Sequence, residues 1–248
     1  MTRLLSLLLI PFYLFSQSAE EVARAVDERN YPSDMQADLT MILTNKQGKT
    51  RESTIRSFSA DDNSKQIIWF LSPPDDKGVA FLKIEHDDGD DEMRLWLPAF
   101  QKVRRISSKK KADSFMGSDL SYEDMTNRDL AEYTYALDGE KIVDGETCHV
   151  LISTPKEGVT RTYGKFVSYV TKDDYRTIYE EAFDRTGKLL KTREVKFQQV
   201  GTYTLPVEMF VKNVQDNHST KLVFANITVD QGVEEDLFQE KNLKRMPR

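Results

Sequence analysis

The sequence has 248 residues, a formal net charge of −6, and 39% hydrophobic against 31% charged residues. This length is enough to build a sizeable core in one large or two small domains. A single cysteine, Cys148, excludes an internal disulfide framework, and the acidic balance disfavours nucleic-acid binding.

The N-terminal segment has the composition of a secretory signal peptide. Arg3 supplies a positive start, residues 4–15 are mostly apolar, and Ser16 and Ser18 occupy the −3 and −1 positions of a cut before Ala19. Because a transmembrane helix needs about 20 apolar residues, this run is too short to span a bilayer. An uncleaved hydrophobic anchor is the alternative.

We therefore expect residues 1–18 to be removed and residues 19–248 to be exported as one domain. No cysteine follows the apolar run at a position suited to lipid attachment, so we do not expect the chain itself to be lipidated.

A short helix is predicted first, and strands dominate the rest of the chain. Residues 19–30 place Ala19, Val22, Ala23 and Val26 on one helical face. After it, alternating apolar segments recur with turn signals every 10–15 residues or so, which is typical of consecutive antiparallel strands. Near the C-terminus, we expect a short helix to dock Leu237 and Phe238. The pattern predicts a mainly β protein of α+β type.

Several predicted strands are apolar on both faces, which is uncommon in an antiparallel sheet with one wet face. The clearest examples are residues 67–70, 79–82 and 95–97. A strongly curved sheet explains this pattern if its concave side holds a helix or ligand and its convex side is partly covered. A tightly packed sandwich explains it equally well.

Residues that could support catalysis or bind a metal are scarce. The three histidines stand apart, and His149 and its neighbour Cys148 should point to opposite faces of a strand. The acidic turn at residues 87–92 lacks the glycine and glutamate spacing of a calcium loop. We expect no catalytic residue, no metal and no cofactor, and we rank an exported hydrolase last.

One basic cluster stands out in this acidic chain. Lysine on an edge strand blocks aggregation, so a solvated edge is one interpretation. Attraction to anionic lipid headgroups or to an acidic partner is the other, since each such charge near a membrane contributes about 1 kcal/mol. The cluster comprises Lys102, Arg104, Arg105, Lys109, Lys110 and Lys111.

The next segment, SFMGSDLSYEDM at residues 114–125, carries two large apolar residues on a glycine hinge. Ser121 and Asp124 have the spacing of a capping box, which predicts a short helix that directs Met125 inward. Gly117 permits a sharp bend before that helix. Phe115 and Met116 are then either the plug of a lid or a permanent core anchor.

Residues 95–125 resemble the hallmark segment of bacterial outer-membrane lipoprotein-sorting-like proteins, a LolA-like family. The matching parts are LWLP at residues 95–98, RRI at 104–106, FMGSD at 115–119 and YED at 122–124. The resemblance extends over most of residues 19–248. It implies an incomplete antiparallel β-barrel of about eleven strands that encloses lid helices and an apolar cavity.

The resemblance also implies a non-enzymatic periplasmic carrier for lipid or lipoprotein acyl chains, which passes them towards the outer membrane. An accessory subunit of an RND-type lipid exporter is the alternative, and an outer-membrane acceptor is a further partner class. We expect Phe115, Met116, Gly117 and Met125 to form the lid. The candidate cavity residues, chosen from alternation, are Met41, Trp69, Phe81, Leu95, Met209 and Phe224.

Overall fold

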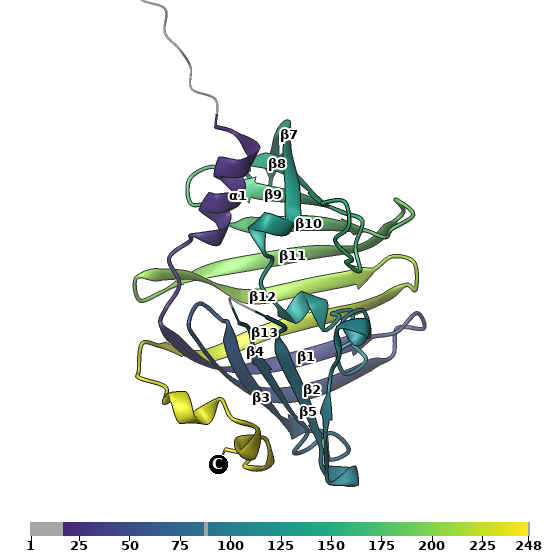
Figure 1. The fold of residues 1–248 in the computed structure, drawn as a ribbon, viewed down its shortest axis with the longest axis vertical. Coiled ribbons are helices and arrows are strands. Elements are labelled where there is room, and N and C mark those ends of the chain that lie inside the picture. The colour runs from purple at the N-terminus through teal and green to yellow at the C-terminus, as the bar shows by residue number, and fades with distance from the viewer. Residues whose placement is uncertain (1–16, 87–88, 248) are drawn as a thin grey trace, which may run out of the picture.

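The computed structural model describes residues 17–86 and 89–247, so most of the predicted signal peptide lies outside the described residues. These residues form one 13-stranded antiparallel sheet (Figure 1). The strands are β1 (Asp34–Thr44), β2 (Thr50–Ala60), β3 (Lys65–Ser72), β4 (Ala80–Ile84), β5 (Glu92–Leu97), β6 (Lys102–Arg105), β7 (Tyr133–Val143), β8 (Glu146–Pro155), β9 (Lys165–Thr171), β10 (Thr177–Phe183), β11 (Leu189–Val200), β12 (Tyr203–Asn213) and β13 (His218–Val229).

The strand order is β6-β5-β4-β3-β2-β1-β13-β12-β11-β10-β9-β8-β7. The chain therefore runs outward from β1 to one edge, crosses to the far edge at β7, and returns strand by strand until β13 pairs with β1. Met41 faces Leu222 across that central pair. The sheet is open, which confirms the incomplete barrel and rules out the sandwich, although thirteen strands are present where about eleven were expected.

The helices of the described chain are short. They are α1 (Ala19–Asp27) and the 3-10 helices η1 (Pro98–Phe100), η2 (Ser108–Lys110), η3 (Glu123–Met125), η4 (Leu130–Glu132), η5 (Glu235–Leu237) and η6 (Glu240–Lys244). Over residues 17–86 and 89–247, none of them has the length and apolar character needed to cross a bilayer.

Helix α1 begins with the local signals that its sequence carries. Ser18 accepts from the backbone N–H of Glu21, and the Glu21 carboxylate accepts from the backbone of Ser18, which completes a capping box. The predicted apolar face is buried: Val22 is fully buried, and it packs with Ala23 in a cluster with Leu151 of β8. The helix thereby covers the β7–β8 edge of the sheet.

The apolar character of both faces of β3 to β5 has two separate causes. Because side chains alternate along a strand, Ile68 and Phe70 join one core cluster while Ile67 and Trp69 join another. The first cluster lies on the concave face, which lines a large hollow. The second lies on the convex face, where the C-terminal segment covers it.

That C-terminal cover is formed by η5 and η6 together with the residues between them. Phe238 is 3% exposed and Leu243 is 1% exposed, and both belong to the core cluster that contains Trp69 and Leu82. Leu237 joins the same cluster while remaining partly exposed. The predicted docking of Leu237 and Phe238 is therefore confirmed, with two 3-10 turns in place of one helix.

Replacing Phe238 with alanine should destabilise the protein by about 3–5 kcal/mol, because it empties an aromatic site in a closed cluster. The measurement is the free energy of unfolding in urea. Met246→Ala, at a partly exposed site further along the same segment, should change it by about 0.5 kcal/mol or less. Equal effects of the two changes would show that the C-terminal segment is not part of the core.

Candidate functional site

The segment that joins β6 to β7 crosses the concave face of the sheet. We call residues 106–132 the crossing segment, and in Figure 1 its teal turns lie in front of the strands. Because β6 and β7 are the two outer edges of the sheet, this connection must span the hollow between them. Its side chains consequently meet residues from both halves of the sheet.

The first anchor of the crossing segment is Phe115, which is 3% exposed. Its ring centroid lies 5.2 Å from that of Phe81, 6.2 Å from Phe70 and 5.8 Å from Tyr122. Edge-to-face contacts of this kind add to the burial of apolar area. Phe115 is therefore fixed within the concave core cluster.

A tight backbone turn holds Phe115 in this position. Met116 and Gly117 have φ angles of +51° and +78°, and the glycine adopts this region at little steric cost. The backbone N–H of Phe115 donates to the carbonyl of Leu120 at 2.7 Å, and Ser114 pairs with Ser121 in an isolated β-bridge. The predicted glycine bend is thus part of a closed loop.

The predicted capping interaction between Ser121 and Asp124 is present in both directions. The Asp124 carboxylate accepts from the backbone N–H of Ser121 at 2.7 Å, and Ser121 Oγ accepts from the backbone N–H of Asp124 at 3.2 Å. Lys191 donates to Asp124 at 2.8 Å, and this cation holds the pKa of the buried Asp124 carboxyl below its usual range.

The helix expected after this cap is limited to the single 3-10 turn η3. Thr126 already has extended φ and ψ angles, and η4 begins separately at Leu130. The backbone N–H of Asn127 donates to Glu85 at 3.1 Å, so a tertiary contact takes the place of an intrahelical bond. Met125 nevertheless lines the hollow, as the sequence predicted.

A buried charged cluster fixes the second half of the crossing segment to the sheet. Both terminal nitrogens of Arg128 donate to Glu180 of β10 at 2.8 Å, and Arg193 of β11 lies 2.9 Å from the same carboxylate. Ser168 Oγ also donates to Glu180, and the Arg128 guanidinium stacks 3.5 Å from the Phe166 ring centroid. Burial alone would raise the pKa of Glu180, but these partners lower it to about 2.

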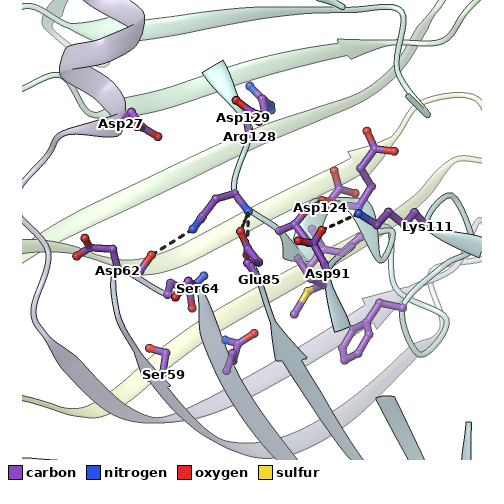
Figure 2. Close-up of a pocket in the computed structure, with 18 of the residues that line it drawn as sticks. Asp27, Ser59, Asp62, Ser64, Glu85, Asp91, Lys111, Asp124, Arg128 and Asp129 are labelled. Carbon is purple, nitrogen blue, oxygen red and sulfur yellow. Dashed lines mark hydrogen bonds and ion pairs between the residues drawn. The ribbon is translucent and has the colours of Figure 1, made fainter. Parts of the chain in front are cut away.

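The hollow between the crossing segment and the sheet has a volume of about 2150 Å³. This exceeds the roughly 300–1,000 Å³ of pockets that enclose drug-sized ligands. Its lining includes charged side chains of both signs, among them Asp27, Glu85, Lys111 and Arg128, which Figure 2 labels. Its apolar lining includes Leu39, Met41, Ile55, Ile68, Met125, Met209, Leu222 and Phe224.

The structure divides the six predicted cavity residues into three groups. Met41, Met209 and Phe224 line the hollow. Phe81 and Leu95 lie on the same face but deeper, in the cluster with Phe115.

Trp69 does not face the hollow, and this corrects the prediction. It lies opposite Ala80 in the register and packs on the convex face with Phe238, whereas its neighbour Ile68 faces the concave side. A strand that is buried on both faces carries no polar residue to show which face is which.

Some of the predicted lid residues and basic residues line the hollow, and others do not. Phe115 and Met125 line the hollow, Met116 packs on the concave cluster, and Gly117 lies next to Leu43. Of the basic residues, Arg105, Lys109 and Lys111 are among those that line the hollow. Arg104 and Lys110 are exposed, while Lys111 pairs with Asp91 at 2.7 Å.

Groups with potential reactivity lie apart from one another or serve structural contacts. Cys148 and His149 occupy successive positions of β8, so they point to opposite faces, as expected. His218 Nδ1 lies 2.8 Å from Asp119, which also accepts from Thr220 and thereby ties the crossing segment to β13. Within residues 17–86 and 89–247, no group of three or more metal-binding side chains converges.

Comparison with known proteins identifies the class that this half-barrel and hollow define. A LolA superfamily protein from Nitrosomonas europaea has the same fold, with a TM-score of 0.72 at 16% identity over 91% of this chain and 99% of that one. A DUF1329 family protein from Desulfovibrio piger is 29% identical, with a TM-score of 0.85 over 91% and 97% of the two chains.

A further solved structure shows the family to which this chain belongs. An outer membrane lipoprotein-sorting protein domain from Vibrio parahaemolyticus is 32% identical, with a TM-score of 0.85 over 91% of this chain and 98% of that one. A family model described as "Uncharacterized protein" matches residues 62–245, and comparison with curated proteins gives no match. The chain belongs to the outer membrane lipoprotein-sorting family, and it shares its fold with the LolA superfamily protein.

The Glu180 cluster makes a prediction for acid stability. Since the pKa of Glu180 falls from 4.5 to about 2 on folding, its stabilisation is present above about pH 4.5 and is lost as the pH falls towards 2. The difference corresponds to about 3 kcal/mol. Urea unfolding between pH 7 and pH 2 should show this loss in the natural protein.

Glu180→Gln should remove that part of the pH dependence and should destabilise the protein at pH 7 by about 1–3 kcal/mol, because the partly buried guanidinium groups of Arg128 and Arg193 lose their counter-ion. Glu157→Gln, at an exposed site, should leave both quantities unchanged. An unaltered pH profile in Glu180→Gln would show that the cluster does not couple to folding.

Proposed function

We propose that this protein is an exported, non-enzymatic carrier that holds the acyl chains of a lipid or lipoprotein in the hollow. The observation that carries the proposal is a hollow of about 2150 Å³ with an apolar floor beneath the crossing segment. A relative 32% identical over nearly its whole length is a lipoprotein-sorting domain, which supports the same role.

The energetics favour such a ligand. Burying an acyl chain contributes about 0.8 kcal/mol per methylene, so a chain of about 14 carbons gives on the order of 11 kcal/mol before costs. Association costs at least about 4 kcal/mol. Useful affinity therefore needs only apolar walls, which Leu39, Met41, Met209 and Phe224 supply.

The two halves of the concave face suit different parts of an amphipathic ligand. The side of β1 to β5 carries the apolar residues Ile55, Ile68 and Phe81, whereas the side of β8 to β11 carries the polar or charged residues Ser153, Glu180 and Arg193. An acyl chain would lie along the apolar side with its polar end towards the charged side. The exporter-subunit hypothesis has no comparable support within the described residues.

We further propose that the crossing segment acts as a cover whose two parts differ. The Phe115 end is held by apolar burial and serves as the fixed part. Residues 125–127 line the hollow between the fixed residues Asp124 and Arg128, and the contact of Asn127 with Glu85 is one that water can replace. This second part would move aside as ligand enters.

Export to the periplasm is part of the proposal. It rests on the composition of residues 1–18, which precede the capped start of α1, and on the likeness to a lipoprotein-sorting domain. Lipoprotein transfer between two membranes takes place in that compartment. A core without disulfides, whose one cysteine, Cys148, is buried, is compatible with its oxidising conditions.

The carrier proposal predicts that lipid co-purifies with the protein. Solvent extraction followed by mass spectrometry should find acyl lipid in the natural protein. Phe224→Ser should lower the affinity for lipid by about tenfold, because it removes about 1–2 kcal/mol of apolar contact in the hollow.

Val223→Ser is the matched control, since Val223 neighbours Phe224 on the same strand but points to the opposite face. It should retain lipid at the natural level. Absence of lipid from the natural protein, together with no uptake of added fatty acid, would refute the carrier proposal.

Hydrogen exchange tests the two-part cover. The amides of Phe115 and Ser118 should exchange only through global unfolding. The amide of Asn127 should exchange faster in the empty protein and become slower when lipid is bound. Exchange of all of these amides at one fast rate would instead show that the whole crossing segment moves as a lid.

A further inference from the structure

An exposed aromatic residue lies outside the hollow, at the hairpin that joins β5 to β6. Phe100 in η1 is 69% exposed, although large apolar side chains are usually buried. Ala99, Gln101 and Lys102 beside it are exposed as well. In Figure 1 this turn lies at the lower extremity of the molecule, at the opposite end of the long axis from α1.

The fold holds this hairpin tip in a defined shape. Pro98 begins the turn, and its carbonyl accepts from the backbone N–H of Gln101 at 3.0 Å. Pro98 also packs closely on the neighbouring turn, where a Cβ added to Gly78 would lie 3.3 Å from Pro98 Cγ. The turn is therefore braced without any contribution of Phe100 to the core.

Exposed cations follow the tip along the edge of the sheet. Lys102, Arg104 and Arg105 are exposed on the edge strand β6, and Lys109 follows in η2. Over the described part of the chain, no acidic side chain forms an ion pair with any of these four, whereas Lys111 pairs with Asp91.

This positive charge is local. The chain as a whole has a net charge of −6, and Lys110, next along the chain, lies 3.8 Å from Asp113. The turn between β3 and β4 beside the tip adds one exposed charge of each sign, Asp75 and Lys77. The tip and β6 therefore form a positive edge on an acidic protein.

We propose that the Phe100 tip and the β6 edge dock on the surface of an anionic lipid bilayer. Aromatic side chains favour the interfacial layer of a membrane, and nearby cations are attracted to its anionic headgroups. Phe100 supplies the apolar anchor, and Lys102 and Arg104 supply the charge.

This docking would place the hollow beside the membrane. Arg105 and Lys109 line the hollow as well as continuing the basic edge, so the same run of residues leads from the tip to the cavity. The purpose of docking rests on the proposed carrier function, because a carrier must exchange its ligand with a bilayer. The docking itself is independent of whether lipid occupies the hollow.

Sedimentation with vesicles tests the proposal. The protein, purified after export, is mixed with vesicles of phosphatidylcholine that contain phosphatidylglycerol, and in parallel with phosphatidylcholine alone. We expect binding to the anionic vesicles only, and weaker binding as added salt screens the charges. Equal binding to both vesicles, or binding to neither, would overturn the proposal, and the latter result is also the one expected of an acidic protein partner.

Variants locate the surface. Lys102→Gln with Arg104→Gln should weaken vesicle binding by about fivefold for each charge removed, and Phe100→Ser by about tenfold. The controls are Lys188→Gln with Lys212→Gln, at exposed sites on other strands and turns, and Ile142→Ser, which is 75% exposed at the β7–β8 hairpin. Losses in the controls as large as those in the variants would overturn the assignment to β6.

Measuring retained lipid separates this proposal from the carrier proposal. Phe100→Ser should take up added fatty acid at the natural level while binding anionic vesicles about tenfold more weakly. A natural protein that binds anionic vesicles but contains and takes up no lipid would refute the carrier proposal alone. One that carries lipid but ignores vesicles would refute the docking alone.

Discussion

The path of the chain across its own sheet determines the rest of this structure. Because β1 and β13 pair at the centre, the two halves of the sheet grow outward to β6 and β7, and one connection must join these distant edges. That connection, the crossing segment, passes over the concave face. It therefore needs apolar side chains directed at the sheet, and Phe115 meets this need. The space that it does not fill is the hollow.

Charge fixes the crossing segment on both of its sides. Arg128 binds Glu180 on the β10 side, and Asn127 binds Glu85, which in turn pairs with the fully buried Lys83 of β4 at 2.6 Å. Buried ion pairs often contribute little net stability, because desolvation offsets their attraction, yet breaking one is costly. These contacts define where Asn127 and Arg128 meet the sheet. An apolar floor combined with charged side walls is what an amphipathic ligand requires.

The sequence allowed correct predictions of the features that depend on interactions between residues close in sequence. The alternation of apolar and polar residues predicted the strands, and the spacing of Ser121 and Asp124 predicted their reciprocal hydrogen bonds. Both features depend on residues that are close in sequence. Trp69 was assigned to the wrong face because its strand is apolar on both sides. The Glu180 cluster was missed because its partner Arg128 is 52 residues away. The signal that the sequence offered was a glutamate two residues before the buried Ala182, on the same face of β10. The volume of the hollow depends on sheet curvature, which alternation does not encode.

The central pairing of the first and last strands also determines when the protein can fold. Met41 of β1 pairs with Leu222 of β13, which lies near the end of the sequence. Strand β1 can therefore pair only with β2 until nearly the whole chain is available for folding. An unpaired strand in the middle of a growing sheet is open to pairing with other chains. Such distant contacts make folding slow. A chain that crosses a membrane from its N-terminus would therefore complete its sheet only after translocation ends, and it would need protection from aggregation until then.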